Sequence, residues 1–171
     1  ATDIGSNSSR LLLADVVDGQ VDELSRESIV TRLGDGVDSS GALNEASIVR
    51  VLEAIDRYAT AIEGAGCERI GGVATSAVRE AENGGELIAR IAESCGIAVD
   101  VIGGDREAEL TFIGASTGDA IDREGRSLVI DIGGGTSDLA IYCEGVPWFV
   151  SVVPIGGDLI TNDITHLVHV P

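Results

Sequence analysis

The tripeptide Asp-Ile-Gly occurs twice in the chain, at residues 3–5 and 131–133, and each copy runs into a stretch of small and hydroxyl residues. The first copy continues Ser-Asn-Ser-Ser from Ser6, and the second continues Gly-Gly-Thr-Ser from Gly134. A carboxylate at a strand end can reach a cation, while a turn of small residues lets backbone N–H groups converge on an anion. Two such loops facing one another would form a clamp for a metal ion and phosphate groups.

The segments around the two copies predict the same order of elements. An apolar strand leads into each loop and a second strand leaves it, after which an acidic residue plus glycine turns the chain into a third strand. The turns are Asp18-Gly19 and Glu144-Gly145, and Asp-Gly between apolar runs is a strong hairpin signal. The repeat is therefore larger than the tripeptide, and its paired loops with matching acids favour ligand binding over a purely architectural duplication.

Between the copies, the sequence predicts alternating helices and strands, which is an α/β pattern. Asn44 is a helix-capping residue, and Gly64 and Gly66 are typical of a helix end. The predicted elements are a loop at 34–41, helices from 44 to 64, from about 85 to 95 and from about 104, strands at 70–74, 99–102 and from 128, and a last helix through 160–167.

Charge and composition restrict the class of ligand. The chain of 171 residues carries 29 acidic and 11 basic residues, giving a net charge of −18, and every basic residue is arginine. Binding to nucleic acid is disfavoured by this balance. A Walker A nucleotide site is excluded because that loop requires a lysine on the phosphates.

Cysteine usage and hydropathy predict a cytoplasmic location. Cys67, Cys95 and Cys143 are odd in number and lack a CxxC spacing, which favours reduced thiols over disulfides or a zinc site. No apolar run reaches the roughly 18 residues of a membrane helix, and no secretory leader precedes Asp3.

Four motifs, in order along the first 140 residues, resemble those of the Ppx/GppA exopolyphosphatase and guanosine-pentaphosphate phosphohydrolase family. They are Asp-Ile-Gly-Ser-Asn-Ser from Asp3, Ala-Thr-Ser-Ala-Val-Arg-Glu-Ala from Ala74, Val-Ile-Gly-Gly-Asp-Arg-Glu-Ala from Val101 and Val-Ile-Asp-Ile-Gly-Gly-Gly from Val129. Residues 138–166 are more similar to actin-like proteins of the FtsA and PilM type. The resemblance implies ribonuclease-H-like, actin-like domains, each a mixed β-sheet flanked by helices.

The position of the second copy predicts how the domains divide. We expect domain I, with the first phosphate loop, at residues 1–125. Residues 126–171 are expected to form the first β-hairpin, second phosphate loop and helix of a truncated domain II. Such a fragment would expose strand edges and an apolar face, which predicts a homodimer.

The family resemblance also implies a role for individual residues. Glu107 would be the catalytic base that orients or deprotonates water. From the residues alone, Glu107 is equally a carboxylate favoured by a helix N-terminus, and an arginine such as Arg79 after a strand is more often a surface ion-pair partner. The implied phosphate-binding residues are Gly5, Ser6, Asn7, Ser8, Arg79, Gly133, Gly134, Gly135 and Thr136, and the implied Mg²⁺ ligands are Asp3, Asp131 and Asp138.

Three functional hypotheses follow. The first is a Mg²⁺-dependent hydrolase that releases terminal phosphate from polyphosphate or guanosine pentaphosphate, a reaction that needs charge neutralisation and alignment. The second is an actin-like nucleotide-binding scaffold that works through assembly. The third is an isolated, inactive folding unit. Dependence of phosphate release on Glu107 separates the first from the others.

Overall fold

The protein is described by a computed structural model covering residues 1–116, 125–134, 136–153, 155–157, 159, 161 and 167. The chain forms two compact units, Ala1–Ile102 and Gly103–Pro171. Gly135 of the second predicted loop, the predicted connector at 117–124 and most of the predicted last helix lie outside the described residues.

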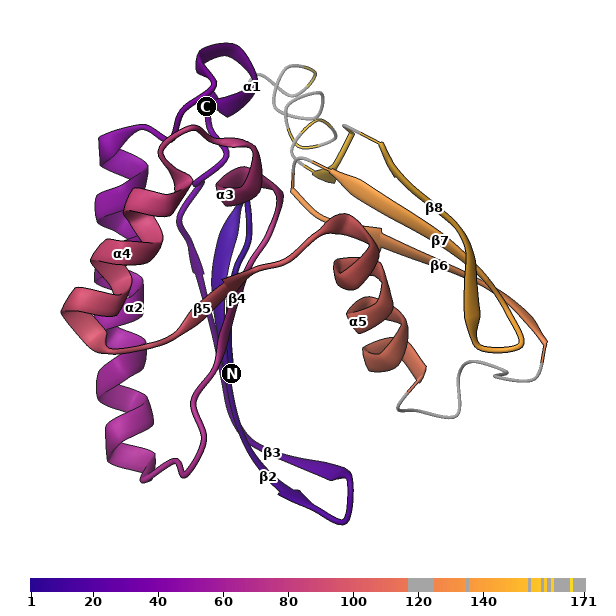
Figure 1. The fold of residues 1–171 in the computed structure, drawn as a ribbon, viewed down its shortest axis with the longest axis horizontal. Coiled ribbons are helices and arrows are strands. Elements are labelled where there is room, and N and C mark those ends of the chain that lie inside the picture. Colours follow the sequence, from indigo (N-terminus) through magenta and orange to yellow (C-terminus); the bar gives the residue numbers. More distant parts are fainter. Residues whose placement is uncertain are drawn as a thin grey trace. The chain divides into compact units, whose positions relative to one another are not determined.

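A five-stranded mixed sheet forms the first unit (Figure 1). The strands lie in the order β3-β2-β1-β4-β5. Strands β1, β2 and β3 pair antiparallel, whereas β4 and β5 run parallel to β1 because helices connect them. The strand bounds are β1 Thr2–Ile4, β2 Ser8–Val17, β3 Gln20–Val30, β4 Gly72–Ala74 and β5 Val99–Val101.

Helices α2 (Glu45–Ala65) and α4 (Gly84–Cys95) lie side by side against this sheet (Figure 1). The side chain of Asn44 caps α2 by accepting the N–H of Ser47 at 2.8 Å, and Gly66 ends the helix with a φ of 65°. Both ends were predicted, and the structure confirms them. The buried core includes Ile4, Leu11, Leu33, Ile48, Val51, Ile55, Tyr58, Leu87 and Ile91.

Two short helices differ from the sequence-based expectation. Helix α1 (Val37–Ser40) lies within the predicted loop at 34–41, and α3 (Ser76–Glu80) directly follows β4. Helices of about one turn show no apolar periodicity, because a single turn cannot repeat a hydrophobic face. Their positions are set by the neighbouring backbone instead.

Tyr58 joins α2 to the sheet immediately after the first predicted loop. Its ring is fully buried, and its hydroxyl donates a 2.7 Å hydrogen bond to the carbonyl oxygen of Ser9. Burial, assisted by the negative charge of Glu27, raises the pKa of Tyr58. The neutral phenol is therefore the form that stabilises the folded unit.

The second unit is built around an antiparallel sheet of order β6-β7-β8, with bounds Arg126–Ile132, Ser137–Cys143 and Val146–Val153. Helix α5 (Gly104–Ser116) packs on one face of the sheet. The rings of Phe112 and Tyr142 stack with centroids 3.7 Å apart, and the Tyr142 hydroxyl donates to the carbonyl oxygen of Ala108 at 2.7 Å. By packing, α5 thus belongs with the second unit, whereas the sequence analysis assigned it to residues 1–125.

The predicted duplication is confirmed in the strand pairing. In each unit three consecutive strands pair antiparallel, β1-β2-β3 in the first and β6-β7-β8 in the second. The turn between the last two strands has positive φ at both central residues, 53° and 80° for Asp18-Gly19 and 52° and 77° for Glu144-Gly145. These angles are those of a type I′ turn, whose twist matches that of the flanking strands.

No helix among the described residues is both long and apolar enough to cross a bilayer. On β8, Trp148 is 76% exposed, and it is the single tryptophan of the chain.

Gly84 at the start of α4 provides a test of the packing in the first unit. A Cβ atom there would overlap the backbone carbonyl oxygen of Val78, whereas a Cβ on Gly85 would meet nothing within 4 Å. We expect Gly84→Ala to lower the free energy of unfolding by about 2 kcal/mol. Gly85→Ala should be neutral or stabilising by up to about 1 kcal/mol, because alanine favours the helix. Urea denaturation of both variants measures the difference, and equal stabilities would contradict the packing described.

Candidate functional site

The first predicted phosphate loop, Gly5–Ser8 (loop 1), joins β1 to β2 through a tight hairpin. The N–H of Gly5 donates to the carbonyl oxygen of Ser8 at 3.1 Å. A Cβ on residue 5 would lie 3.1 Å from that same oxygen, so a larger residue would open the turn. Ser6 and Asn7 form its tip, and their N–H groups have no hydrogen-bond acceptor among the described residues.

Residues 31–34 form backbone hydrogen bonds to loop 1. The carbonyl oxygen of Asn7 accepts the N–H groups of Thr31 at 3.0 Å and of Arg32 at 2.8 Å, and that of Ser6 accepts the N–H of Gly34 at 2.7 Å. The loop carbonyls are therefore turned toward this segment. Since a carbonyl oxygen repels an anion, their engagement leaves the N–H groups of the tip as the groups suited to phosphate.

Other predicted residues lie at the same edge of the first unit's sheet. Loop 1 follows β1, Thr75 follows β4 and Ile102 follows β5, and the carboxyl ends of parallel strands share one edge, where α/β sheets commonly bind ligands. The Ser6 and Ser76 hydroxyls are 3.0 Å apart. Arg79 of α3 donates to the carbonyl oxygen of Ile102 at 2.8 Å. This edge thus gathers loop 1, two hydroxyls and a guanidinium.

Asp3 and Arg79 both have ionic neighbours. The carboxylate of Asp3 lies 3.8 Å from the guanidinium of Arg10, its cross-strand partner on β2. The guanidinium of Arg79 is 3.5 Å from the carboxylate of Glu80. Their assignment to metal and to phosphate stays a prediction.

The second loop, residues 133–136 (loop 2), repeats the closure of loop 1. The N–H of Gly133 donates to the carbonyl oxygen of Thr136 at 2.8 Å, and a Cβ on residue 133 would lie 3.1 Å from that oxygen. Residues 155–157 support loop 2, because Gly157 donates its N–H to the carbonyl oxygen of Gly133 at 2.8 Å. Ser137 adds a 2.6 Å hydrogen bond from its hydroxyl to the carbonyl oxygen of Ile155.

Two predicted metal ligands are neighbours in the sheet beside loop 2. Asp131 of β6 and Asp138 of β7 are direct cross-strand partners, and like charges in that position destabilise a sheet. A divalent cation would remove this repulsion. Among the described residues, no three His, Cys, Asp or Glu side chains form a cluster that could hold a metal. The pair alone is a suitable donor set for Mg²⁺, which usually binds one or two carboxylates together with water and substrate phosphates.

Glu107, the predicted base, lies in the first turn of α5 in the same unit. Its side chain is half-buried, and its N–H donates to the carbonyl oxygen of Gly103 at 2.9 Å. Helix α5 covers the sheet face of Val129 and Ala140, and the Asp131–Asp138 pair lies one pleat further along that face. The helix and the acidic pair therefore share one side of the sheet.

Sequence reasoning missed the residues that support the loops. Ser76 contacts loop 1 by its hydroxyl, Gly34 and Arg32 by their backbones, and Gly156 packs on loop 2. Two signals could have identified them: the hydroxyl pair Thr75-Ser76 near the start of the Ala74 motif, and the Gly-Gly pair at 156–157.

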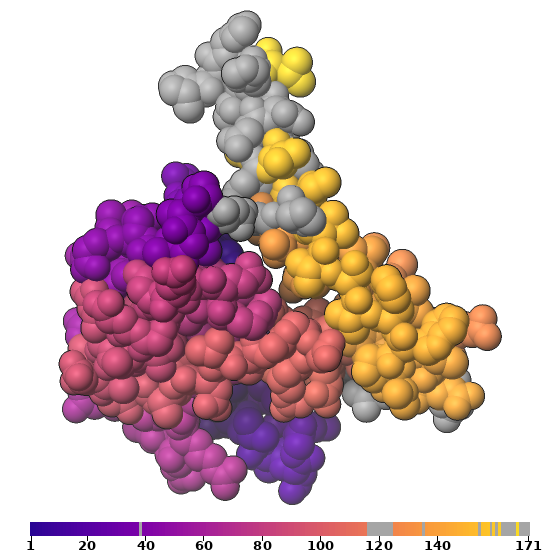
Figure 2. Space-filling model, turned by 45° about the horizontal axis from the view of Figure 1, so that its top comes forward, coloured from indigo at the N-terminus to yellow at the C-terminus, as the bar shows by residue number. Residues whose placement is uncertain are grey.

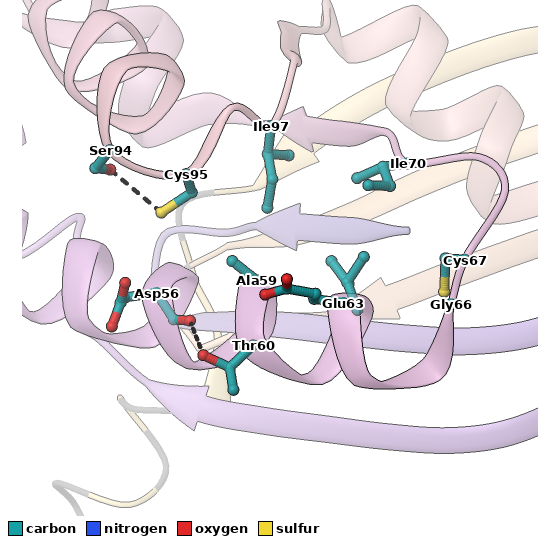
Figure 3. Close-up of a pocket in the computed structure, with 11 residues that line it drawn as sticks. Asp56, Ala59, Thr60, Glu63, Gly66, Cys67, Ile70, Ser94, Cys95 and Ile97 are labelled. Atoms are coloured by element: carbon teal, nitrogen blue, oxygen red, sulfur yellow. Dashed lines mark hydrogen bonds between the residues drawn. The ribbon is translucent and has the colours of Figure 1, made fainter.

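A separate cavity of about 570 Å³ lies between the end of α2 and the residues around Cys95 (Figure 3). It adjoins the residues that precede β4 and β5, so it lies at the opposite ends of these strands from loop 1. Asp56 and Glu63 line it together with the thiols of Cys67 and Cys95, and no arginine is among its described lining residues. Two carboxylates without a cation disfavour phosphate there.

The fold is that of actin-like proteins. The MreB5 structure of Spiroplasma citri bound to ADP matches with a TM-score of 0.56 and 20% identity, over 98% of this chain and 55% of that one. The PilM–PilN type IV pilus biogenesis complex matches with a TM-score of 0.64 and 15% identity, over 99% of this chain and 65% of that one. At these identities the likeness concerns the fold alone, and it confirms the predicted fold class.

A family model for the Ppx/GppA phosphatase family matches residues 12–169, and the chain belongs to that family. Exopolyphosphatase 1 of Mycobacterium tuberculosis is 30% identical over 167 residues, which are 94% of this chain and 47% of that protein. The exopolyphosphatase structure from Cytophaga hutchinsonii matches with a TM-score of 0.84 and 30% identity, over 95% of this chain and 52% of that one. The chain spans about half the length of these relatives, and the family resemblance is confirmed.

Gly156 provides a test of the support beneath loop 2. A Cβ at residue 156 would overlap the backbone of Gly134, whereas a Cβ on Gly157 would lie 3.6 Å from the carbonyl oxygen of Gly133 in ordinary contact. We expect Gly156→Ala to shift the amide resonances of Gly133 and Gly134 and to destabilise the second unit by about 2 kcal/mol. Gly157→Ala, the matched control, should change both far less. NMR and thermal denaturation measure these effects, and similar spectra for both variants would refute the contact.

Proposed function

We propose that the protein is a Mg²⁺-dependent hydrolase that releases the terminal phosphate of polyphosphate. The observation that carries this proposal is the pair of loops with the same closure, Gly5 N–H to Ser8 and Gly133 N–H to Thr136, in a chain whose relatives are exopolyphosphatases. Guanosine pentaphosphate has the same terminal phosphoanhydride chemistry and is the second substrate proposed.

The free thiols of Cys67, Cys95 and Cys143 suit a reducing compartment, and we place the protein in the cytoplasm.

Backbone N–H groups are the main phosphate donors in this proposal. The N–H groups of Ser6 and Asn7 in loop 1 and of residues 134 and 135 in loop 2 would bind phosphate oxygens, with the hydroxyls of Ser6, Ser8 and Thr136 beside them. Arg79 would add a charged, bidentate contact. Such donors let a chain of net charge −18 bind a polyanion without a broad basic surface.

Glu107 would act on the attacking water. The carboxylate accepts a proton as the water oxygen forms a bond to the terminal phosphorus, and the bond from that phosphorus to the bridging oxygen breaks. The shortened chain leaves with its negative charge on the former bridging oxygen, and the proton then passes from Glu107 to the released phosphate or solvent. Alignment and charge stabilisation dominate such transfers, so no covalent intermediate is required.

Asp131 and Asp138 would hold Mg²⁺ beside loop 2, and Asp3, in the strand that precedes loop 1, is the other residue proposed as a Mg²⁺ ligand. Their fit rests on the cross-strand position of Asp131 and Asp138, which places two carboxylates together beside loop 2. When bound, the ion neutralises charge on the phosphate oxygens as a Lewis acid. The carboxylates themselves position the ion relative to loop 2, since both belong to the strands that the loop connects.

Replacing Glu107 tests the hydrolase directly. We expect Glu107→Gln to lower kcat for phosphate release from polyphosphate about 100-fold or more while leaving polyphosphate affinity nearly unchanged, because the amide cannot accept the proton. Glu109→Gln on the same helix is the control, since Glu109 is exposed and pairs with Arg106 at 2.6 Å. Phosphate-release kinetics with and without Mg²⁺ measure both. ATP binding and assembly that do not depend on Glu107 would instead support the nucleotide-binding scaffold.

We also propose that this chain homodimerises through the sheet face opposite α5, which we call the outer face. Strand β8, golden in Figure 2, lies at the surface of the second unit. The outer face contains no charged side chain in its central rows, so two copies of an acidic chain could meet there without repulsion. Its exposed residues include Leu128, Ile130, Ile132 and Phe149, at 57%, 51%, 65% and 54%.

Light scattering at micromolar concentration tests the homodimer. We expect the mass of two chains for the wild type and of one chain for Ile130→Asp, because a carboxylate in the outer face would have to be desolvated on association. Val16→Asp, at an exposed position of β2 in the first unit, should leave the dimer intact. A wild-type mass of one chain would refute the proposal.

A further inference from the structure

Arg32 has a backbone conformation that is unusual for its residue type. Its φ is 47°, in the left-handed region, which an L-residue with a long side chain adopts only under constraint. The other non-glycine residues with positive φ in the described structure, Asp18 and Glu144, belong to the two type I′ turns. Arg32 is in no such hairpin turn, so another interaction must impose its conformation.

Hydrogen bonds on both sides of Arg32 supply that constraint. Its N–H donates to the carbonyl oxygen of Asn7 in loop 1 at 2.8 Å, and its carbonyl oxygen accepts the hydroxyl of Ser47 at 2.9 Å. Ser47 is fully buried at the start of α2. The main chain of Arg32 is thus fixed between loop 1 and α2, and the exposed side chain is carried on a rigid backbone.

Ser47 also connects Arg32 to a second arginine. The guanidinium of Arg50 donates to the Ser47 hydroxyl at 2.7 Å and, through Nε, to the carbonyl oxygen of Thr31 at 2.8 Å. These bonds use two of the five N–H donors of the guanidinium. Arg50 is therefore oriented by the same network and keeps donors for a further partner.

Arg32 and Arg50 line one cavity of about 420 Å³ with Val30 and Asp35. Two guanidinium groups and one carboxylate give this cavity a formal charge of +1, in a chain of −18. Most described arginines have a carboxylate within 4 Å, including Arg26, Arg57, Arg90 and Arg106. Arg32 has no ion pair with any described residue, despite the excess of acids.

We propose that Arg32 and Arg50 form a second phosphate-binding position beside loop 1, which takes a further phosphate group of a polyphosphate chain. The inference rests on the proposed function and specifies how an extended substrate is held. Paired guanidinium forks match phosphate oxygens bidentately. A bound phosphate would also account for a strained, unpaired arginine, since contacts to the ligand offset the cost of holding it in place.

Calorimetric titration with tripolyphosphate and with long-chain polyphosphate tests the position. We expect Arg32→Gln and Arg32→Gly to weaken binding of the long chain about tenfold, the loss of one charge-assisted contact. Asp35→Asn should strengthen it, because the substitution removes the only carboxylate among the described cavity residues. Arg69→Gln is the control for net charge, since Arg69 is exposed and lies ahead of β4 at the opposite end of the strand from loop 1.

Thermal stability separates ligand binding from a structural role of Arg32. If the side chain serves the ligand, Arg32→Gly should raise Tm while weakening binding, because glycine adopts positive φ without strain. A lower Tm together with unchanged affinity would assign Arg32 to the fold and overturn the inference. Wild-type affinity in both Arg32 variants would also overturn it and leave the proposed function standing. Failure of the wild type to bind any polyphosphate would refute the proposed function and this inference together.

Discussion

Each half of the repeat depends on one hydrogen bond, from a glycine N–H to the carbonyl oxygen three residues later. This bond closes loop 1 at Gly5 and loop 2 at Gly133, where little room exists for a side chain. It also fixes the pairing register of the two strands that each loop connects. Because side chains alternate between the faces of a sheet, a shift of one residue would move every apolar side chain to the wrong face. The position of the acidic pair at 131 and 138 follows from the same register.

The loops are also supported from outside the hairpins. Residues 31–34 bond to the carbonyl groups of loop 1, and residues 155–157 play the same part for loop 2. In the first unit this support extends into the core, because Ser47 and Tyr58 of α2 bond to the backbone at Arg32 and Ser9. A loop that binds phosphate by its backbone must keep its N–H groups in place before the ligand arrives, and such support supplies that preorganisation.

Local signals in the sequence predicted much of this fold. The cap at Asn44, the stop at Gly66 and both acidic-glycine turns were identified, because each depends on residues a few positions apart. The loops were located by their composition for the same reason. What could not be predicted depends on contacts between residues that are distant in sequence. These are the stacking of Phe112 on Tyr142, which joins α5 to the second sheet, the packing of Gly156 against loop 2, and the hydrogen bond that links Arg32 to α2.

The distribution of aromatic residues gives the two units different optical signatures. Trp148, the single tryptophan, lies on β8 of the second unit and is largely exposed. Each unit has one buried tyrosine, Tyr58 in the first and Tyr142 in the second. Fluorescence excited at wavelengths that tyrosine does not absorb therefore originates entirely in the second unit. Tryptophan emission from this chain therefore reports on the sheet that carries loop 2. It does not detect unfolding that is confined to the sheet that carries loop 1.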